Sequence, residues 1–307
     1  MSGHLCPICA HGCRRSTANA TPLRVVFDEI QRIRLARGQL AAKTWGMTAI
    51  LQKTIPYNPL EPRKLPGIQP LALQDWLIWD DGFAAQMAER ERLLAQRRAA
   101  VVQMSEEALP AAKELLAMVL ADRYPDLPAG ADRVQRPDGA EVRIDSSDPM
   151  GTLGRITQQD FCILQKPEGA GEHVLTAAVL CFPANWTLAE KFMRPLIAIH
   201  APVDSYDSGI AARVQRLFDG VQVGRPLWRF NALWYADATL HQPRPVTGDR
   251  PRPSAEDAQY MRSERQTILR LPQSRAVVFG IHTFVLQRMD LLAQWGASVD
   301  RVETAGV

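Results

Sequence analysis

Four short apolar runs in the second half of the chain limit its fold more than any other feature of the sequence. They cover residues 161–165, 175–182, 226–235 and 276–285, and the last two are rich in aromatic and β-branched residues. Runs of this length and composition are typical of β-strands. Residues 166–173, between the first two runs, contain Pro, Gly and acidic residues, as hairpin loops do. The sequence therefore predicts antiparallel strands in this half.

The preceding part of the chain predicts helices instead. Residues 83–102 have a long helical pattern, and a second helix is expected over residues 105–121, with Ser105 as its N-cap. Pro125 should end this helix, because proline disfavours helix in the residue before it. Residues 125–155 are rich in Asp, Pro and Gly, which indicates an irregular connection.

Shorter helices are expected among the strands. Thr187 and Glu190 have the spacing of a capping box, so a helix should begin there and should be kinked or broken at Pro195. Residues 214–218 indicate another short helix. Helices that precede an antiparallel sheet with a few further helices predict an α+β fold.

Residues 1–50 differ from the rest of the chain. Their Cys6, Cys9, His11 and Cys13 are too crowded for the two separated half-sites of a structural zinc centre. We expect a poorly ordered extension, or a start codon assigned too early, with Met47 as the alternative start. The prolines of residues 55–67 then predict an extended strap. We assign residues 51–295 to one domain and residues 296–307 to a C-terminal tail.

Composition excludes several classes of function. The 36 basic and 33 acidic residues leave a net charge of only +3, which provides no general field for nucleic acid or an anionic membrane. The sequence has no apolar stretch of membrane-spanning length and no signal-peptide core, and its five cysteines do not form a secreted disulfide framework. We therefore expect a cytoplasmic protein. Hydrolase, NTPase and dinucleotide-binding signatures are also missing from the sequence.

The six histidines are the natural candidates for metal or acid–base chemistry. His200 closes an apolar segment, residues 195–199, and a neutral imidazole among apolar walls with cations nearby is what haem requires. An isolated histidine in such a setting is more often a hydrogen-bonded core residue, so both interpretations stay open. His173 is expected on the surface and His241 in a turn, while His282 lies inside the last strand.

Several short sequence motifs, taken in order, bear on whether His200 is a haem ligand or a core residue. Together they resemble the alpha subunits of haem-dependent oxidative N-demethylases over roughly residues 55–290. The phrases are PYNP (56–59) with LPG (65–67), DFCIL (160–164), AVLCFP (178–183), IHAPV (199–203), RPLWRFN (225–231), RSERQTILRLP (262–272) and VFGIHTF (278–284).

The resemblance implies a PAS-like fold, in which a curved antiparallel sheet with an N-terminal helical section cups a b-type haem. It implies oxidation of a secondary amine such as dimethylamine by O₂, with release of formaldehyde. Electrons would come from NADPH through separate reductase subunits that carry FMN and a 2Fe-2S centre, and tetrahydrofolate on a folate-binding subunit would capture the formaldehyde. The sequence has no motif for those further cofactors, which agrees with such a division of labour.

The resemblance also implies roles for single residues. The IHAPV phrase makes His200 the iron ligand, and Arg229, Asn231 and Arg265 fall on polar phrases that imply contacts with the cofactor or the pocket. Two differences from the family bear on the pocket. Ala232 stands where the family tends to have tryptophan, and His282 stands where arginine is common.

A carboxylate is expected to hold the amine. Glu264, Asp80 and Asp81 are the candidates, although for the two aspartates helix capping or surface pairing is the favoured interpretation. Two alternatives to catalysis stay open from the sequence. One is a haem-based gas or redox sensor without turnover, and the other is a haem-free binding subunit, since a fold alone does not decide function.

Overall fold

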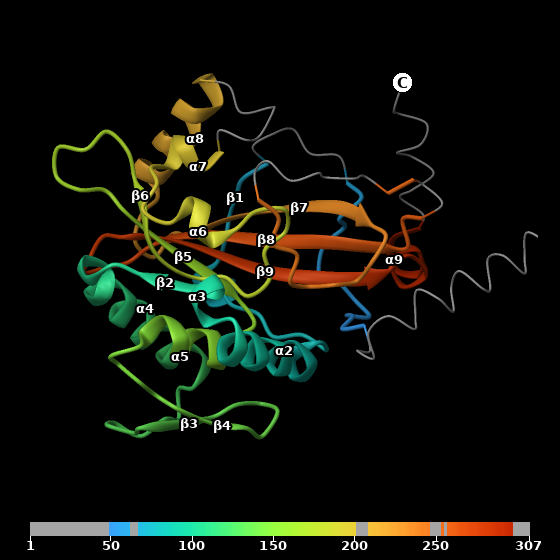
Figure 1. Cartoon of the computed structure of the whole chain (residues 1–307), viewed down its shortest axis with the longest axis horizontal. Helices are drawn as coiled ribbons and strands as arrows, with labels where there is room; N and C mark the ends of the chain where they lie inside the picture. The colour runs from blue at the N-terminus through green and yellow to red at the C-terminus, as the bar shows by residue number, and fades with distance from the viewer. Residues whose placement is uncertain (1–48, 62–66, 201–207, 246–252, 255–256, 297–307) are drawn as a thin grey trace, which may run out of the picture. The chain divides into compact units, whose positions relative to one another are not determined.

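The computed structural model describes residues 49–61, 67–200, 208–245, 253–254 and 257–296 (Figure 1). The predicted extension of residues 1–50 lies outside these ranges except for its last two residues, and so does the tail except for residue 296. Both assignments therefore stay predictions. For the described residues, the centre of the fold is one large antiparallel sheet.

The sheet has seven strands, and every neighbouring pair in it is antiparallel. The four apolar runs form β5, β6, β7 and β9, so the predicted strands are confirmed. With the helices described below, the predicted α+β class is confirmed as well. In spatial order the strands are β1 (Gln69–Pro70), β7 (Leu227–Tyr235), β8 (Tyr260–Arg270), β9 (Val277–Gln287), β5 (Asp160–Gln165), β6 (Val174–Val179) and β2 (Val102–Met104).

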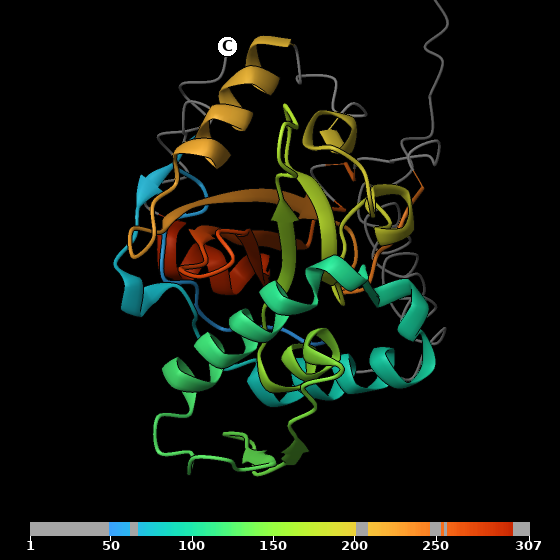
Figure 2. The same cartoon turned by 90° about the vertical axis from the view of Figure 1, so that its left-hand side faces the viewer.

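One face of the sheet is covered by the N-terminal helical section (Figure 2). The predicted helix over residues 83–102 is interrupted at Arg97, and the chain enters β2 at Val102. Ser105 precedes the next helical segment, but its side chain makes no capping hydrogen bond. The segments of this section are η1 (Leu73–Asp75), α2 (Phe83–Gln96), α3 (Arg98–Val101), η2 (Glu106–Ala108), α4 (Leu109–Arg123) and α5 (Pro149–Ile156).

The irregular connection predicted for residues 125–155 is wrong. A small two-stranded sheet, β3 (Arg133–Gln135) and β4 (Glu141–Arg143), lies there and is followed by α5. Asp148 caps α5 by accepting a hydrogen bond from the backbone N–H of Gly151. Three-residue strands are too short for a periodic pattern, which explains why composition alone suggested a loop.

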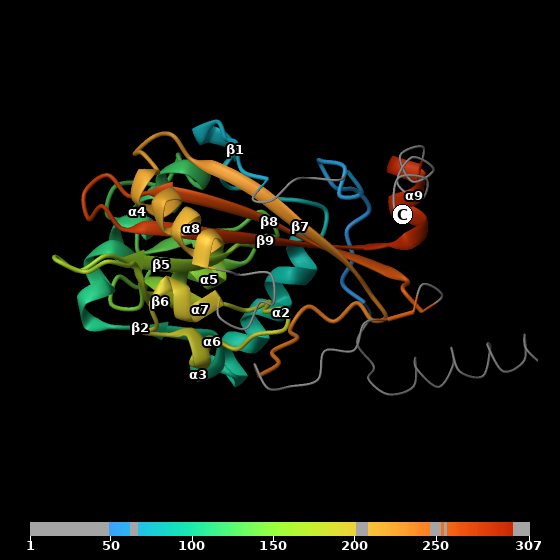
Figure 3. The ribbon, with the colours of Figure 1, turned by 90° about the horizontal axis from the view of Figure 1, so that it is seen from above.

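Three helices cover the other face of the sheet and lie over its strands in Figure 3. They are α6 (Leu188–Lys191), α7 (Leu196–His200) and α8 (Ser208–Gly220). The predicted break before α7 is confirmed, because α6 ends early and Met193 takes a positive φ of 57° between the two. The helix expected over residues 214–218 is confirmed as part of α8.

The chain enters and leaves the domain beside the end of the sheet. Residues 49–61 contain no helix or strand and lie against β9 and α9 (Arg288–Trp295). The backbone N–H of Gln52 donates to Val285 O at 2.9 Å, and the side chain of Gln294 brackets Ile55 with one bond to its N–H and one to its carbonyl. The strap was predicted for residues 55–67; residues 55–61 contain no helix or strand, as the prolines predicted, and residues 62–66 lie outside the described ranges.

Candidate functional site

A cavity of about 410 Å³ lies between the sheet and the α6–α8 layer. This volume is in the range of small-molecule and cofactor sites. Its walls are mainly apolar, and they combine strand residues with residues from all three covering helices and their connections. The apolar lining includes Leu164, Leu175, Leu196, Ile199, Val214, Leu217, Phe218, Ile268, Phe279 and Ile281.

The polar lining of the cavity comes mainly from β7 and β8. Successive residues of a strand project from opposite faces of a sheet, so alternate positions share one face. Arg229 and Asn231 of β7 line the cavity, and Arg262, Glu264 and Gln266 of β8 line it with them. The register places Asn231 directly opposite Glu264, and Arg229 opposite Gln266.

Glu264 is the only acidic residue among the described cavity-lining residues. Its side chain is almost buried, and its Oε2 accepts hydrogen bonds from two amides. Asn231 Nδ2 donates at 3.1 Å, and Gln266 Nε2 donates at 3.2 Å. Asn231 therefore contacts a carboxylate directly within the cavity.

Arg262 is anchored beside Glu264 by main-chain carbonyls. One of its terminal nitrogens donates to Leu240 O at 2.9 Å, and the other donates to Phe182 O at 2.7 Å. Its Nη2 lies 3.9 Å from Glu264 Oε1, which is a loose ion pair. Its Nε is buried and has no hydrogen-bond partner in the described part of the chain.

Arg229 is the least compensated cation of the cavity. Burial lowers the pKa of its guanidinium, and the nearby Glu264 carboxylate offsets only part of this effect. Its Nε is also buried without a partner among the described residues. Buried polar atoms without protein partners are rare in native proteins and often contact a bound water or ligand. With Lys191, which lies over the Trp186 ring at 4.4 Å, the lining carries three cations and one anion.

His200 is the last residue of α7, and its neighbour Ile199 lines the cavity. The structure describes only the backbone of His200, so the predicted iron contact of its side chain lies outside the described part. Cys162 also lines the cavity, and burial raises the pKa of its thiol to about 12. This thiol is therefore neutral and unsuited to act as a nucleophile.

Arg265, Asp80 and Asp81 do not line the cavity. Arg265 follows Glu264 along β8 and so projects from the opposite face, where its Nη2 donates to Asp75 O at 2.7 Å. Asp81 accepts the backbone N–H of Lys53 at 2.8 Å, next to the strap. Successive residues of a strand face opposite sides of the sheet, which explains why the neighbouring residues Glu264 and Arg265 lie in different environments.

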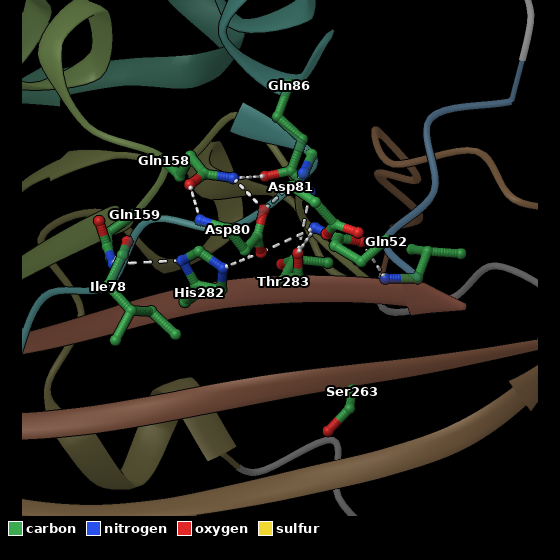
Figure 4. Close-up of polar contacts among 12 residues, drawn as sticks. Gln52, Ile78, Asp80, Asp81, Gln86, Gln158, Gln159, Ser263, His282 and Thr283 are labelled. Carbon is green, nitrogen blue, oxygen red and sulfur yellow. Dashed lines mark hydrogen bonds and ion pairs between the residues drawn. The ribbon is translucent and has the colours of Figure 1, made fainter. Parts of the chain in front are cut away.

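Asp80 belongs instead to a second polar cluster on that opposite face, which Figure 4 shows. Gln159 Nε2 donates both to Ile78 O at 3.0 Å and to His282 Nδ1 at 3.1 Å. Because Nδ1 accepts there, the proton of the neutral ring lies on Nε2 and is donated to Asp80 Oδ2 at 2.7 Å. Burial opposes ionisation of Asp80, but hydrogen bonds from His282 and Gln158 outweigh it and lower the pKa of its carboxyl.

In the described part of the chain, no serine, threonine or cysteine side chain is hydrogen-bonded to the His282 ring of this Asp80–His282 cluster. Ser263 lies on the neighbouring strand, away from the His282 ring in Figure 4. Its hydroxyl is 2.9 Å from Tyr57 Oη and donates to Asn231 O at 2.7 Å. The cluster therefore joins the start of α2 to the last strand and does not form a catalytic triad.

The other described histidines are separate from the cavity. The expected surface position of His173 is wrong, since the residue is only 2% exposed and its Nδ1 is 2.9 Å from Gln215 Nε2. His241 Nδ1 donates to Cys181 O at 2.8 Å. Burial lowers the pKa of both rings. Among the described residues, no group of three or more His, Cys, Asp or Glu side chains is arranged to hold a metal ion.

Fold and site together define a class: an α+β protein with a ligand-sized, mainly apolar cavity on one face of an antiparallel sheet. No helix in the described ranges is both long and apolar enough to cross a membrane. Residues 67–302 match the family described as "Haem-dependent oxidative N-demethylase, alpha subunit-like", and the chain belongs to this family. The resemblance found in the sequence is thus confirmed, and the family name describes a haem-dependent oxidoreductase.

Sequence reasoning did not name Gln266 and Lys191 as cavity residues. It also predicted no strand over residues 260–270, which form β8, one of the two longest strands. The signal that was present is the alternation Arg262, Glu264, Gln266, Ile268, which becomes informative only after the segment is recognised as a strand.

Proposed function

We propose that this chain is the haem-binding catalytic subunit of an oxidative N-demethylase and that the described cavity is its active site. The observation that carries the proposal is a buried carboxylate, Glu264, in a mainly apolar cavity whose other charged residues, among those described, are all cations. Apolar walls suit a macrocycle, and the surplus of positive charge suits its two acidic groups. The carboxylate suits a protonated amine.

The residues present fit a b-type haem in two respects. His200 ends the helix that contributes Leu196 and Ile199 to the wall, so it is our candidate for the residue that would hold the haem iron. The unpartnered Nε of Arg229 is available to a propionate. When bound, haem supplies the activation of dioxygen and the transfer of electrons. The PAS-like description of the sheet and the haem pocket itself belong to this proposal.

Glu264 is the candidate that holds the amine substrate. Its Oε2 is occupied by the Asn231 and Gln266 amides, while Oε1 has only the loose contact with Arg262. An ammonium N–H can donate to Oε1, and apolar neighbours such as Ile281 would contact its alkyl groups. The buried setting excludes water and strengthens this ion pair. Asp80 and Asp81 are not needed for this role.

We further propose a secondary amine such as dimethylamine as the substrate, with formaldehyde as a product. NADPH, FMN, a 2Fe-2S centre and tetrahydrofolate would belong to reductase and folate-binding partner subunits, because no motif for them was found in this chain.

Glu264 favours the enzyme over a gas or redox sensor, since binding of a neutral diatomic gas requires no buried anion. A cytoplasmic location is part of the proposal.

A formaldehyde assay tests the proposed activity. The purified chain is reduced anaerobically together with its reductase partners, dimethylamine is added, and air is then admitted. We expect formaldehyde that depends on both dimethylamine and O₂, and its loss in Glu264→Gln, which retains the size of the side chain but removes its charge. Formation of formaldehyde at the same rate without dimethylamine, or none in the complete system, would contradict the proposal.

A further inference from the structure

Two amide side chains fix the geometry of Glu264. Asn231 lies directly opposite Glu264 in the β7–β8 register. Its Oδ1 accepts the backbone N–H of Glu264 at 3.1 Å, so its Nδ2 must face the Glu264 carboxyl. Gln266 lies two residues along β8, on the same face, and donates to the same carboxyl oxygen. The carboxyl is therefore held from two different strands.

N–H donors face both oxygens of the Glu264 carboxyl. Oε2 accepts hydrogen bonds from Asn231 and Gln266. Oε1 lies 3.9 Å from the Arg262 guanidinium, which is also a donor. Oε1 remains the oxygen that is available to a ligand.

Arg262 does not neutralise this carboxylate by a close ion pair. Its terminal nitrogens are committed to the carbonyls of Phe182, Leu240 and Thr239 at 2.7, 2.9 and 3.3 Å. These bonds hold the guanidinium back, so no bidentate bridge to Glu264 forms. The negative charge of Glu264 therefore stays available at the polar end of an apolar cavity.

We infer that Asn231 and Gln266 are positioning residues that hold Glu264 as an oriented carboxylate, and that the cavity therefore selects an alkylated ammonium cation over an uncharged molecule of similar size. The inference rests on the proposed function, because it takes Glu264 as the group that binds the amine. It adds the reason for the charge selectivity and assigns it to two amides that act through the Glu264 carboxylate.

Equilibrium binding separates this role from a structural one. The full chain, loaded with haem, is titrated calorimetrically with dimethylammonium chloride and with 2-propanol as an uncharged molecule of similar size. We expect the wild type to prefer the ammonium. Asn231→Leu and Gln266→Met should each raise the Kd of the ammonium about tenfold, the effect of one hydrogen bond to a charged group, and should leave the Kd of 2-propanol unchanged.

Combined variants give the decisive comparison. In a Glu264→Gln background, Asn231→Leu and Gln266→Met should change the ammonium Kd by less than about twofold, because they act through the carboxylate. In the assembled enzyme, the two single variants should raise KM more than they lower kcat. Gln222→Met is the matched control, since Gln222 is exposed and outside the cavity lining, and it should bind both compounds like the wild type.

The outcomes distinguish a failure of the proposed amine site from a failure of the positioning role alone. If the wild type binds dimethylammonium no better than 2-propanol, the proposed amine site is wrong. If the wild type prefers the ammonium but both variants retain that preference, or lose as much affinity without the Glu264 charge, the positioning role alone is wrong. A thermal melt checks folding. Should Asn231→Leu not fold, Gln266→Met decides the question, because that change leaves the contact between Asn231 and the Glu264 backbone in place.

Discussion

At the level of single residues, the direction of each side chain from its strand decides which sequence candidates meet. Arg229, Asn231 and Glu264 were named from polar phrases, and all three line one cavity. Arg265 belongs to the same phrase as Glu264 but faces Asp75 on the other side of the sheet. The motif of residues 262–272 identified an important segment. Its residues can be divided between the two faces of the sheet only after the segment is recognised as a strand.

His200 is the residue on which haem binding is expected to depend. His200→Ala should abolish the Soret absorption band of protein expressed with a haem supply, because the axial imidazole is lost. His241→Ala is the control, since His241 does not line the cavity, and it should retain the band. Equal loss of the band in both variants, or its retention in His200→Ala, would exclude His200 as the ligand.

Asp80 predicts a pH-dependent contribution to stability. The pKa of its carboxyl is lowered from 3.8, so the ionised form stabilises the fold above about pH 4, and this contribution is lost as the pH falls through the folded-state pKa. Asp80→Asn should cost roughly 1.5–3 kcal/mol at pH 7, the effect of hydrogen bonds to a charged group. Urea unfolding should show that the cost shrinks below about pH 4. A cost that does not vary with pH would contradict this explanation, and Asp81→Asn is the matched control.

At the level of elements, the sequence predicted the apolar strands and missed the polar one. β5, β6, β7 and β9 were recognised from apolar and aromatic residues. β8 was missed because it contains Arg262, Glu264 and Arg265, which composition assigns to a solvated surface. These charges are buried by the partners that tertiary structure supplies, and such partners have no signature within the segment itself.

The packing of β8 against β9 predicts the effect of a single methyl group. Gly280 lies opposite Thr267, and a Cβ at Gly280 would be 2.6 Å from Thr267 Oγ1. Gly280→Ala should therefore reduce the free energy of unfolding by about 1–3 kcal/mol, the usual cost of overpacking. Thr267→Ala removes the clashing oxygen, so the double variant should recover part of the loss. Additive losses in a urea denaturation series would argue against a direct clash.

At the level of the whole domain, one buried ion pair links the helical layer to the cavity. Arg90 of α2 and Asp160 of β5 are both inaccessible, and Arg90 Nη1 lies 2.7 Å from Asp160 Oδ1. Asp160 also accepts the backbone N–H groups of Cys181 and Phe182 at 2.8 Å. The carbonyl of Phe182 in turn accepts from Arg262, which lines the cavity. A continuous polar path therefore crosses the sheet from one layer to the other.

Breaking this pair should destabilise the whole domain. Arg90→Met leaves Asp160 buried without its cation, and such losses cost about 3–5 kcal/mol. Removal of both charges in Arg90→Met with Asp160→Asn should recover part of that loss, because no unpaired charge then remains. Chemical denaturation measures both values. If the double variant is less stable than Arg90→Met alone, the hydrogen bonds of Asp160 to residues 181 and 182 matter more than its charge.

The alternation along β8 has a consequence for how this protein can change through evolution. Substitutions at Arg262, Glu264 or Gln266 alter the chemistry of the cavity, while Ser263 and Arg265 between them serve the opposite face. A gain or loss of one residue within the strand would exchange these two sets over the remaining length. Point mutation can thus retune ligand preference step by step, whereas insertions and deletions in β8 should be eliminated by selection.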